Sequence, residues 1–147
     1  IKKMKSESPT LSRADIAILT FDGQLIYSEL SKTFEDLAKG EVARSFNYWG
    51  IGDYFVKHFE TVNLIVGKVS DKLAFAICSR EKPGLLILAF TNVVKNYEEI
   101  FKNIEGTLKI AKIEKEEVKI LLQYHLSLTF LQLLLKSFSL YQTQRED

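Results

Sequence analysis

Leu-Thr-Phe-Asp-Gly-Gln-Leu-Ile, residues 19–26, is the stretch that decides how this sequence folds, because an Asp-Gly pair separates two apolar runs. Both central positions of a tight hairpin turn need a positive φ, and Asp and Gly accept that conformation at low cost. We therefore expect an antiparallel hairpin, with strands at residues 15–21 and 24–29.

The pattern after this hairpin predicts one helix and three further strands. Apolar residues recur at helical spacing over residues 41–58, and a GxG at residues 50–52 marks a bend in the expected helix. Strands are expected at residues 61–69, 73–79 and 85–90. The last of these is continuously apolar, as in a strand that is buried on both faces.

Helices complete the chain. Apolar spacing predicts a helix over residues 93–106, which Gly106 would end, and a long helix from Glu114 to Tyr141. We divide the chain into a flexible N-terminal arm at residues 1–13, a domain at 14–113, and a long C-terminal helix with a polar tail at 114–147.

The composition is that of a globular protein that does not bind nucleic acid. The chain has 147 residues, of which 46% are hydrophobic, and this suits a single folded domain. Its 20 basic and 19 acidic residues are mixed along the sequence and give a net charge of +1. Proteins that bind nucleic acid carry a basic excess in a patch or stripe, so we expect no nucleic-acid partner.

No motif for catalysis, metal binding or cofactor binding stands out. His58 and His125 are far apart in sequence and lack the spacing of a metal motif. Cys78 lies in an apolar run, where a small buried thiol is the expected role. The GxG at residues 50–52 has no third glycine and no preceding strand, so it does not predict a phosphate loop. We therefore expect a protein without catalytic residues, cofactor or metal.

The order of elements, together with the Asp22-Gly23 turn, resembles the roadblock/longin superfamily. The sequence at residues 19–26 is similar to the first hairpin of roadblock domains, and the resemblance covers residues 14–106. It implies an α/β fold in which a five-stranded antiparallel sheet carries a helix between strands 2 and 3, with helices at the C-terminal end. A typical roadblock domain begins with a helix before its first strand, and the polar arm offers none. The C-terminal helix exceeds what a minimal roadblock domain needs.

The resemblance implies a function in protein–protein contact. Roadblock domains serve as dimeric scaffolds or regulators of small GTPases and trafficking machinery. We accordingly expect a cytoplasmic, non-catalytic protein that pairs with itself or with a related domain and that contacts a small GTPase. The alternative is a PAS-like or profilin-like module that binds a small molecule in a cavity between sheet and helix.

The candidate interface residues lie in three places. Roadblock relatives commonly pair their third strands edge to edge, which here implies the strand at residues 61–69, with the single charge Lys68. Tyr48 and Trp49 are adjacent on the expected middle helix and cannot both face the sheet, so one of them lies at a boundary. Trp49 either packs against the sheet or anchors a partner from an exposed position. The candidates in these two places and on the final helix are Val62, Leu64, Val66, Tyr48, Trp49, Leu128, Leu131 and Leu135.

The final helix is apolar on most of its sides, whereas a helix on a monomer surface needs one apolar stripe. Three explanations stay open at this point. The helix packs on its own sheet and on a second subunit, or it is buried within one chain, or it inserts into a membrane. For insertion, the 16 uncharged residues at 120–135 fall short of the usual span of about 20.

Overall fold

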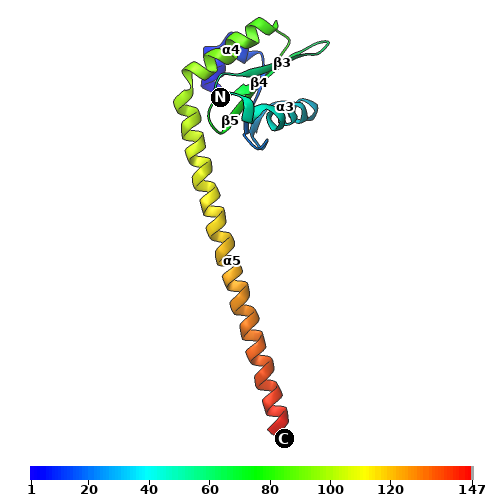
Figure 1. Ribbon diagram of the computed structural model, residues 1–147, viewed down its shortest axis with the longest axis vertical. Coiled ribbons are helices and arrows are strands. Elements are labelled where there is room, and N and C mark those ends of the chain that lie inside the picture. Colours follow the sequence, from blue (N-terminus) through cyan, green and yellow to red (C-terminus); the bar gives the residue numbers. More distant parts are fainter. Residues whose placement is uncertain (147) are drawn as a thin grey trace. The chain divides into compact units, whose positions relative to one another are not determined.

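The computed structural model describes the backbone of residues 1–146 and the side chains of residues 1–109 and 116–137. Five antiparallel strands form one sheet in the order β2-β1-β5-β4-β3. Figure 1 labels three of these strands, β3, β4 and β5. The predicted fold class, with one helix after the second strand and helices at the C-terminal end, is confirmed. The strands are β1 (Asp15–Thr20), β2 (Leu25–Ser28), β3 (Tyr54–His58), β4 (Asn63–Lys68) and β5 (Leu73–Ser79).

The hairpin at the Asp-Gly turn forms as predicted, although of its two central residues only Gly23 has a positive φ. Gly23 has a φ of 84°, which a residue with a side chain rarely adopts. The backbone N–H of Thr20 donates to the carbonyl of Gln24 at 2.8 Å, and this bond closes the turn. The local sequence therefore sets the pairing of β1 with β2.

One face of the sheet is covered by α3 (Lys32–Ser45), which continues into the short 3-10 helix η1 (Phe46–Tyr48). The prediction of a helix over residues 41–58 is wrong at both ends. The helix begins earlier, and residues 54–58 are the edge strand β3. The apolar residues that suggested one helical period belong to two elements, α3 with η1 and the edge strand β3 of the sheet itself. The buried residues on this face are Ala17, Leu19, Leu30, Ala38, Val42, Phe46, Leu64, Val66, Ala74, Ala76 and Cys78.

The opposite face is covered by α4 (Pro83–Asn96) and by the first turns of α5 (Glu98–Glu146). The predicted strand at residues 85–90 is wrong, because this run lies inside α4. Pro83 occupies the first turn of the helix, where its missing N–H costs nothing. Burial then follows helical spacing, at Leu86, Ala89, Phe90 and Val93. A continuous apolar run fits a buried strand and a buried helix equally well, so its period does not separate them.

The first twelve residues form two short helices, α1 (Lys2–Glu7) and α2 (Pro9–Ser12), and not the flexible arm that the sequence suggested. Met4 and Leu11 from these helices are buried in the core. The Nζ atom of Lys5 lies 2.7 Å from Glu29 Oε1 and also donates to the carbonyl of Ala14 at 3.1 Å. The initial helix that seemed to be missing is therefore present.

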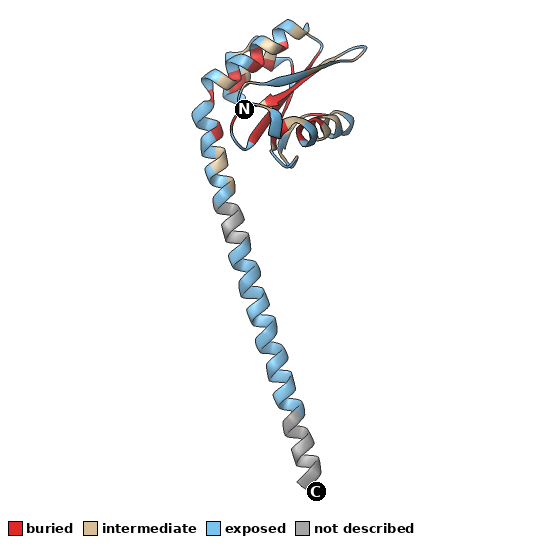
Figure 2. Ribbon diagram, in the orientation of Figure 1, coloured by how far each residue is buried: buried red, intermediate tan, exposed pale blue. Residues whose placement is uncertain are grey.

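The chain forms two compact units, Ile1–Glu105 and Gly106–Asp147. In the first unit the buried residues concentrate in the central strands and on the helix faces turned toward them (Figure 2). Gly106, which we expected to end a helix, lies inside α5. In the second unit every side chain from residue 116 to residue 137 is exposed.

Candidate functional site: an exposed sheet edge

The strand β3 is one of the two free edges of the sheet. It pairs with β4 on one side only, and no strand of the described chain lies on its other side. Its backbone N–H and C=O groups on that side are therefore available to another strand. The second free edge is β2, which has four residues.

The register of β3 with β4 assigns its side chains to the two faces of the sheet. Phe55 lies opposite Val66, and Lys57 lies opposite Leu64, so both belong to the face that α3 covers. Tyr54 lies opposite Gly67 on the α4 face, where its ring packs against Phe90 with 5.8 Å between centroids. Tyr54 is 40% exposed and Phe55 is 37% exposed, so the edge shows a large apolar side chain on each face.

Gly67 of β4 leaves room for the Phe90 side chain of α4 and for the backbone that leads into β3. A Cβ atom at this position would lie 2.3 Å from Phe90 Cζ and 2.6 Å from the carbonyl oxygen of Asp53. The missing side chain thus leaves room for the Phe90 ring on which Tyr54 packs.

The turn that leads into β3 is held by hydrogen bonds to the end of β4. The N–H of Gly52 donates to the carbonyl of Lys68 at 2.8 Å, and the N–H of Lys68 donates to the carbonyl of Asp53 at 2.9 Å. Gly52 has a φ of 98°, which explains the second glycine of the GxG as a turn residue. The ammonium group of Lys68 donates to the carbonyl of Trp49 at 3.2 Å. These hydrogen bonds hold the residues directly before β3 against the end of β4.

Exposed apolar side chains from this turn and from β3 make up what we call the β3 edge surface. Of the adjacent aromatic residues, Trp49 packs against the core on the α3 side, whereas Tyr48 is 87% exposed. The two side chains do not both face the sheet, but Trp49 follows η1 with an extended backbone, so the helical geometry behind this expectation does not apply. The residues of the β3 edge surface are Tyr48, Ile51, Tyr54 and Phe55.

The strand at residues 61–69, which we expected to be third and to offer a free edge, is β4. It has β3 on one side and β5 on the other, so its backbone groups are already paired. Leu64 and Val66 are buried in the core, and Val62 is partly buried against it. The prediction that this strand is a free edge is therefore wrong.

Sequence reasoning missed Tyr54 and Phe55 because it placed them in a helix. One signal could have found them. The turn residues Gly50, Gly52 and Asp53 directly precede a run of aromatic and β-branched residues, which is typical of a strand that follows a turn.

The candidates on the final helix are all exposed. Leu128, Leu131 and Leu135 are 41%, 52% and 61% exposed, and apolar neighbours surround them on the helix. Residues Glu116–Ser137 form a helical stretch that is long and apolar enough to cross a membrane, with a mean hydropathy of 1.4.

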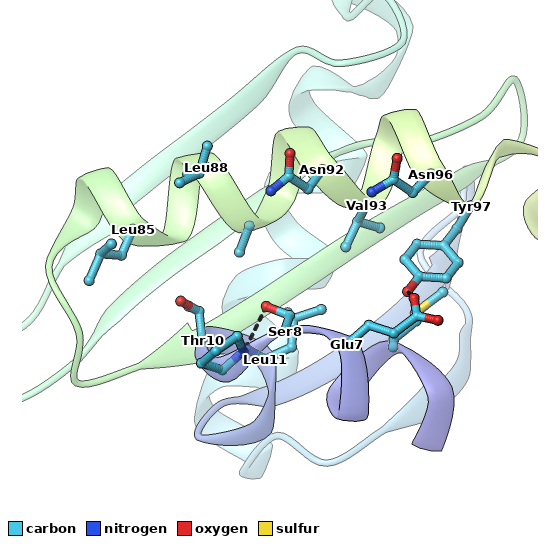
Figure 3. Close-up of a pocket in the computed structure, with 13 residues that line it drawn as sticks. Glu7, Ser8, Thr10, Leu11, Leu85, Leu88, Asn92, Val93, Asn96 and Tyr97 are labelled. Carbon is cyan, nitrogen blue, oxygen red and sulfur yellow. Dashed lines mark hydrogen bonds between the residues drawn. The ribbon is translucent and has the colours of Figure 1, made fainter.

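A pocket of about 220 Å³ lies between the N-terminal helices and α4 (Figure 3). Leu85 and Val93 line it from α4, and Leu11 lines it from α2. At one end the hydroxyl of Tyr97 donates to the carboxylate of Glu7. Burial, and to a smaller extent the hydrogen bond to Glu7, raises the pKa of Tyr97 to about 12. This contact links α1 to the residue between α4 and α5, and the raised pKa keeps the phenol protonated.

Cys78 and His58 are the residues of the first unit that the sequence offered for nucleophilic or metal chemistry. Cys78 is buried, and this burial, with a smaller contribution from the charge of Asp15, raises the pKa of its thiol to about 11. A protonated buried thiol is a poor nucleophile. His58 lies on β3, where its Nδ1 is 2.6 Å from Asn63 Oδ1. Among the residues whose side chains are described, no group of three or more His, Cys, Asp or Glu residues could hold a metal ion.

No protein-family model and no curated protein matches this sequence significantly. Solved structures do match. A roadblock/LC7 domain from Streptomyces avermitilis is 17% identical, with 69% of this chain and 98% of that chain covered and a TM-score of 0.50. MglB from Myxococcus xanthus is 15% identical, with 70% and 98% covered and a TM-score of 0.52. A structure of MglB with a tetrameric arrangement is 12% identical, with 69% and 88% covered and a TM-score of 0.53.

These likenesses show the fold. The chain has a roadblock fold, as its hairpin and element order suggested. The matched chains are covered almost completely, and the remaining part of this chain has no counterpart in them.

Proposed function

We propose that this chain with a roadblock fold is a cytoplasmic, non-catalytic interaction domain that dimerises through β3 and presents the dimer to a small GTPase. The observation that carries the proposal is the free edge of β3 with its exposed apolar side chains. Pairing two such edges extends both sheets by main-chain hydrogen bonds. The assembly named for one structural neighbour, an MglB with a tetrameric arrangement, supports self-association as a use of this fold.

The composition of β3 is compatible with antiparallel self-pairing. In a pair centred on Val56, Tyr54 would face His58 of the partner subunit, and Phe55 would face Lys57 of the partner subunit. No two lysines would then lie directly opposite each other, which avoids repulsion between like charges. The second edge, β2, has one residue fewer to pair.

A matched pair of substitutions tests the dimer. Phe55 on β3 and Ile26 on β2 are each 37% exposed. At both edges, aspartate therefore replaces an apolar side chain of equal exposure. We expect Phe55→Asp to convert the dimer into a monomer, measured as mass by sedimentation in a mild detergent. Ile26→Asp should leave the dimer intact. A monomeric wild type, or a dimer that only Ile26→Asp dissociates, would contradict the proposal.

The GTPase partner is tested by titration calorimetry with purified small GTPases from the same cell, loaded with GDP or with a non-hydrolysable GTP analogue. We expect at least one of them to bind, with an affinity that depends on the nucleotide. Binding should weaken in Phe55→Asp, because the proposed partner recognises the dimer. If no small GTPase binds the wild-type dimer, this part of the proposal is wrong even though dimerisation stands.

A further inference from the structure

Beyond this proposed function, we infer that residues 116–137 of α5, here called the apolar segment, insert into a lipid bilayer and tether the domain to a membrane. The apolar segment is helical throughout, and all its side chains are exposed. An α-helix rises about 1.5 Å per residue. The 22 residues therefore extend about 33 Å, close to the hydrocarbon thickness of about 30 Å.

The distribution of apolar residues around the helix favours a bilayer over a single protein partner. At about 100° per residue, the apolar side chains leave no angular gap wider than about 60°. A helix that is apolar on every side has to be covered on every side. A bilayer does so without any partner of matching shape. These apolar residues are Val118, Ile120, Leu121, Leu122, Tyr124, Leu126, Leu128, Phe130, Leu131, Leu133, Leu134 and Leu135.

A soluble two-stranded coiled coil would cover only part of this surface. Leu121, Leu128 and Leu135 repeat every seven residues and could form its seam. Leu126 and Leu133 lie about 160° around the helix from Leu128 and Leu135, on the side that such a coiled coil turns to water. They are 67% and 59% exposed. A partner on the seam would leave the side chains of these leucines in water, whereas lipid would bury them.

Two hydroxyl residues of the apolar segment fit the same environment. The hydroxyl of Ser127 donates to the carbonyl of Gln123 at 3.0 Å, and that of Thr129 donates to the carbonyl of His125 at 3.0 Å. Such bonds to the preceding turn satisfy a hydroxyl within the helix itself, as a membrane requires.

The ends of the apolar segment carry its charges. The uncharged stretch between Lys119 and Lys136 covers 16 residues, or about 24 Å. A lysine at each end can extend its ammonium group to the headgroups while its methylenes stay in the apolar layer. The 16 uncharged residues alone are too short to cross a bilayer, but with the residues at both ends the 22-residue segment is long enough.

Two double substitutions in the full-length chain test this inference. Leu128→Lys with Leu135→Lys places charges on the seam side, and Leu126→Lys with Leu133→Lys places them on the opposite side. The wild type and both variants are incubated with phosphatidylcholine–phosphatidylglycerol vesicles in high salt, floated on a density gradient and washed with alkaline carbonate. High salt removes binding that depends on charge alone.

We expect the wild type to float and to resist the carbonate wash. Both variants should lose at least tenfold in the floating fraction, because lipid contacts every side of the helix. A wild type that stays in the soluble fraction would overturn the inference. So would a Leu126→Lys, Leu133→Lys variant that behaves as wild type while the seam variant is lost, since this result indicates a coiled coil. Circular dichroism that shows equal helix content in all three proteins confirms that the variants fold.

Discussion

Replacing Gly67 by alanine tests whether close packing behind β3 positions this strand. The new Cβ would lie 2.3 Å from Phe90 Cζ and 2.6 Å from the backbone oxygen of Asp53, and both separations are far shorter than ordinary contacts. The phenyl ring can shift, but the carbonyl belongs to the backbone that leads into β3. Overpacking of a well-filled core costs about 1–3 kcal/mol. Alanine also lowers the conformational entropy of the unfolded chain, which stabilises the folded state by about 0.4–1 kcal/mol. We expect a net loss of about 1 kcal/mol from these two contributions.

The assay is urea unfolding followed by the fluorescence of Trp49, the only tryptophan, which packs against the core beside the turn into β3. Gly84→Ala is the matched control, because a Cβ there would meet no atom within 4 Å. The midpoint should fall for Gly67→Ala and stay or rise for Gly84→Ala. Equal midpoints for Gly67→Ala and the wild type would refute the packing argument.

Three further predictions concern the anchoring of the N-terminal helices. Hydrogen bonds from Lys5, the backbone of Ile16 and Tyr27 together lower the pKa of Glu29 below 4.5 despite its partial burial, which alone would raise it. The carboxylate therefore stabilises the fold above its unfolded pKa, and this contribution is lost as the pH falls below that value. Urea titrations in acid should show a weaker pH dependence for Glu29→Gln than for the wild type, and equal slopes would exclude this role. The raised pKa of Tyr97 stabilises the fold below the unfolded value of 10.0, and this stability is lost as the pH rises toward about 12. Tyr97→Phe should remove that alkaline component, and an unchanged profile in unfolding experiments would count against it. Leu11→Ala should cost about 2–5 kcal/mol because the side chain is fully buried, whereas a flexible arm would show no change in calorimetric Tm.

Local chemistry made part of the fold predictable. The Asp22-Gly23 turn needs only its own residues to specify the β1–β2 hairpin, and this prediction was correct. The strand β5 likewise agrees with its predicted bounds, residues 73–79. Both elements depend on signals within a few residues of sequence.

Tertiary context decided the elements that were predicted wrongly. Residues 85–90 are apolar at every position, so a helix and a buried strand fit them equally well. In the structure this run is helical. Pro83 lies in the first turn of α4, and the ring of Phe90 fills the space over Gly67. The N-terminal helices are short and polar in sequence, and contacts such as that of Lys5 with Glu29 hold them.

The sequence predicted that the candidate site is an edge strand, but it did not predict which strand forms the edge. The resemblance to roadblock domains pointed to an edge strand, yet only the sheet order reveals that the edge is β3 and that β4 is internal. Tyr48 was identified from the sequence as a candidate and is exposed, whereas Leu64 and Val66 belong to the core. Strand order depends on pairing between distant segments, which periodicity within one segment does not encode.

Disulfide trapping along β3 tests the central claim, dimerisation through this edge, most directly. Single cysteines are introduced at each position of Tyr54–His58 and, as the control series, of Leu25–Ser28 on β2. Residues that face themselves across an antiparallel pair have Cα atoms about 4.5–5.5 Å apart, within reach of a disulfide. Under mild oxidation we predict covalent dimers in the β3 series, with a maximum near Val56, and none in the β2 series. Covalent dimers confined to β2, or none in either series, would contradict the account.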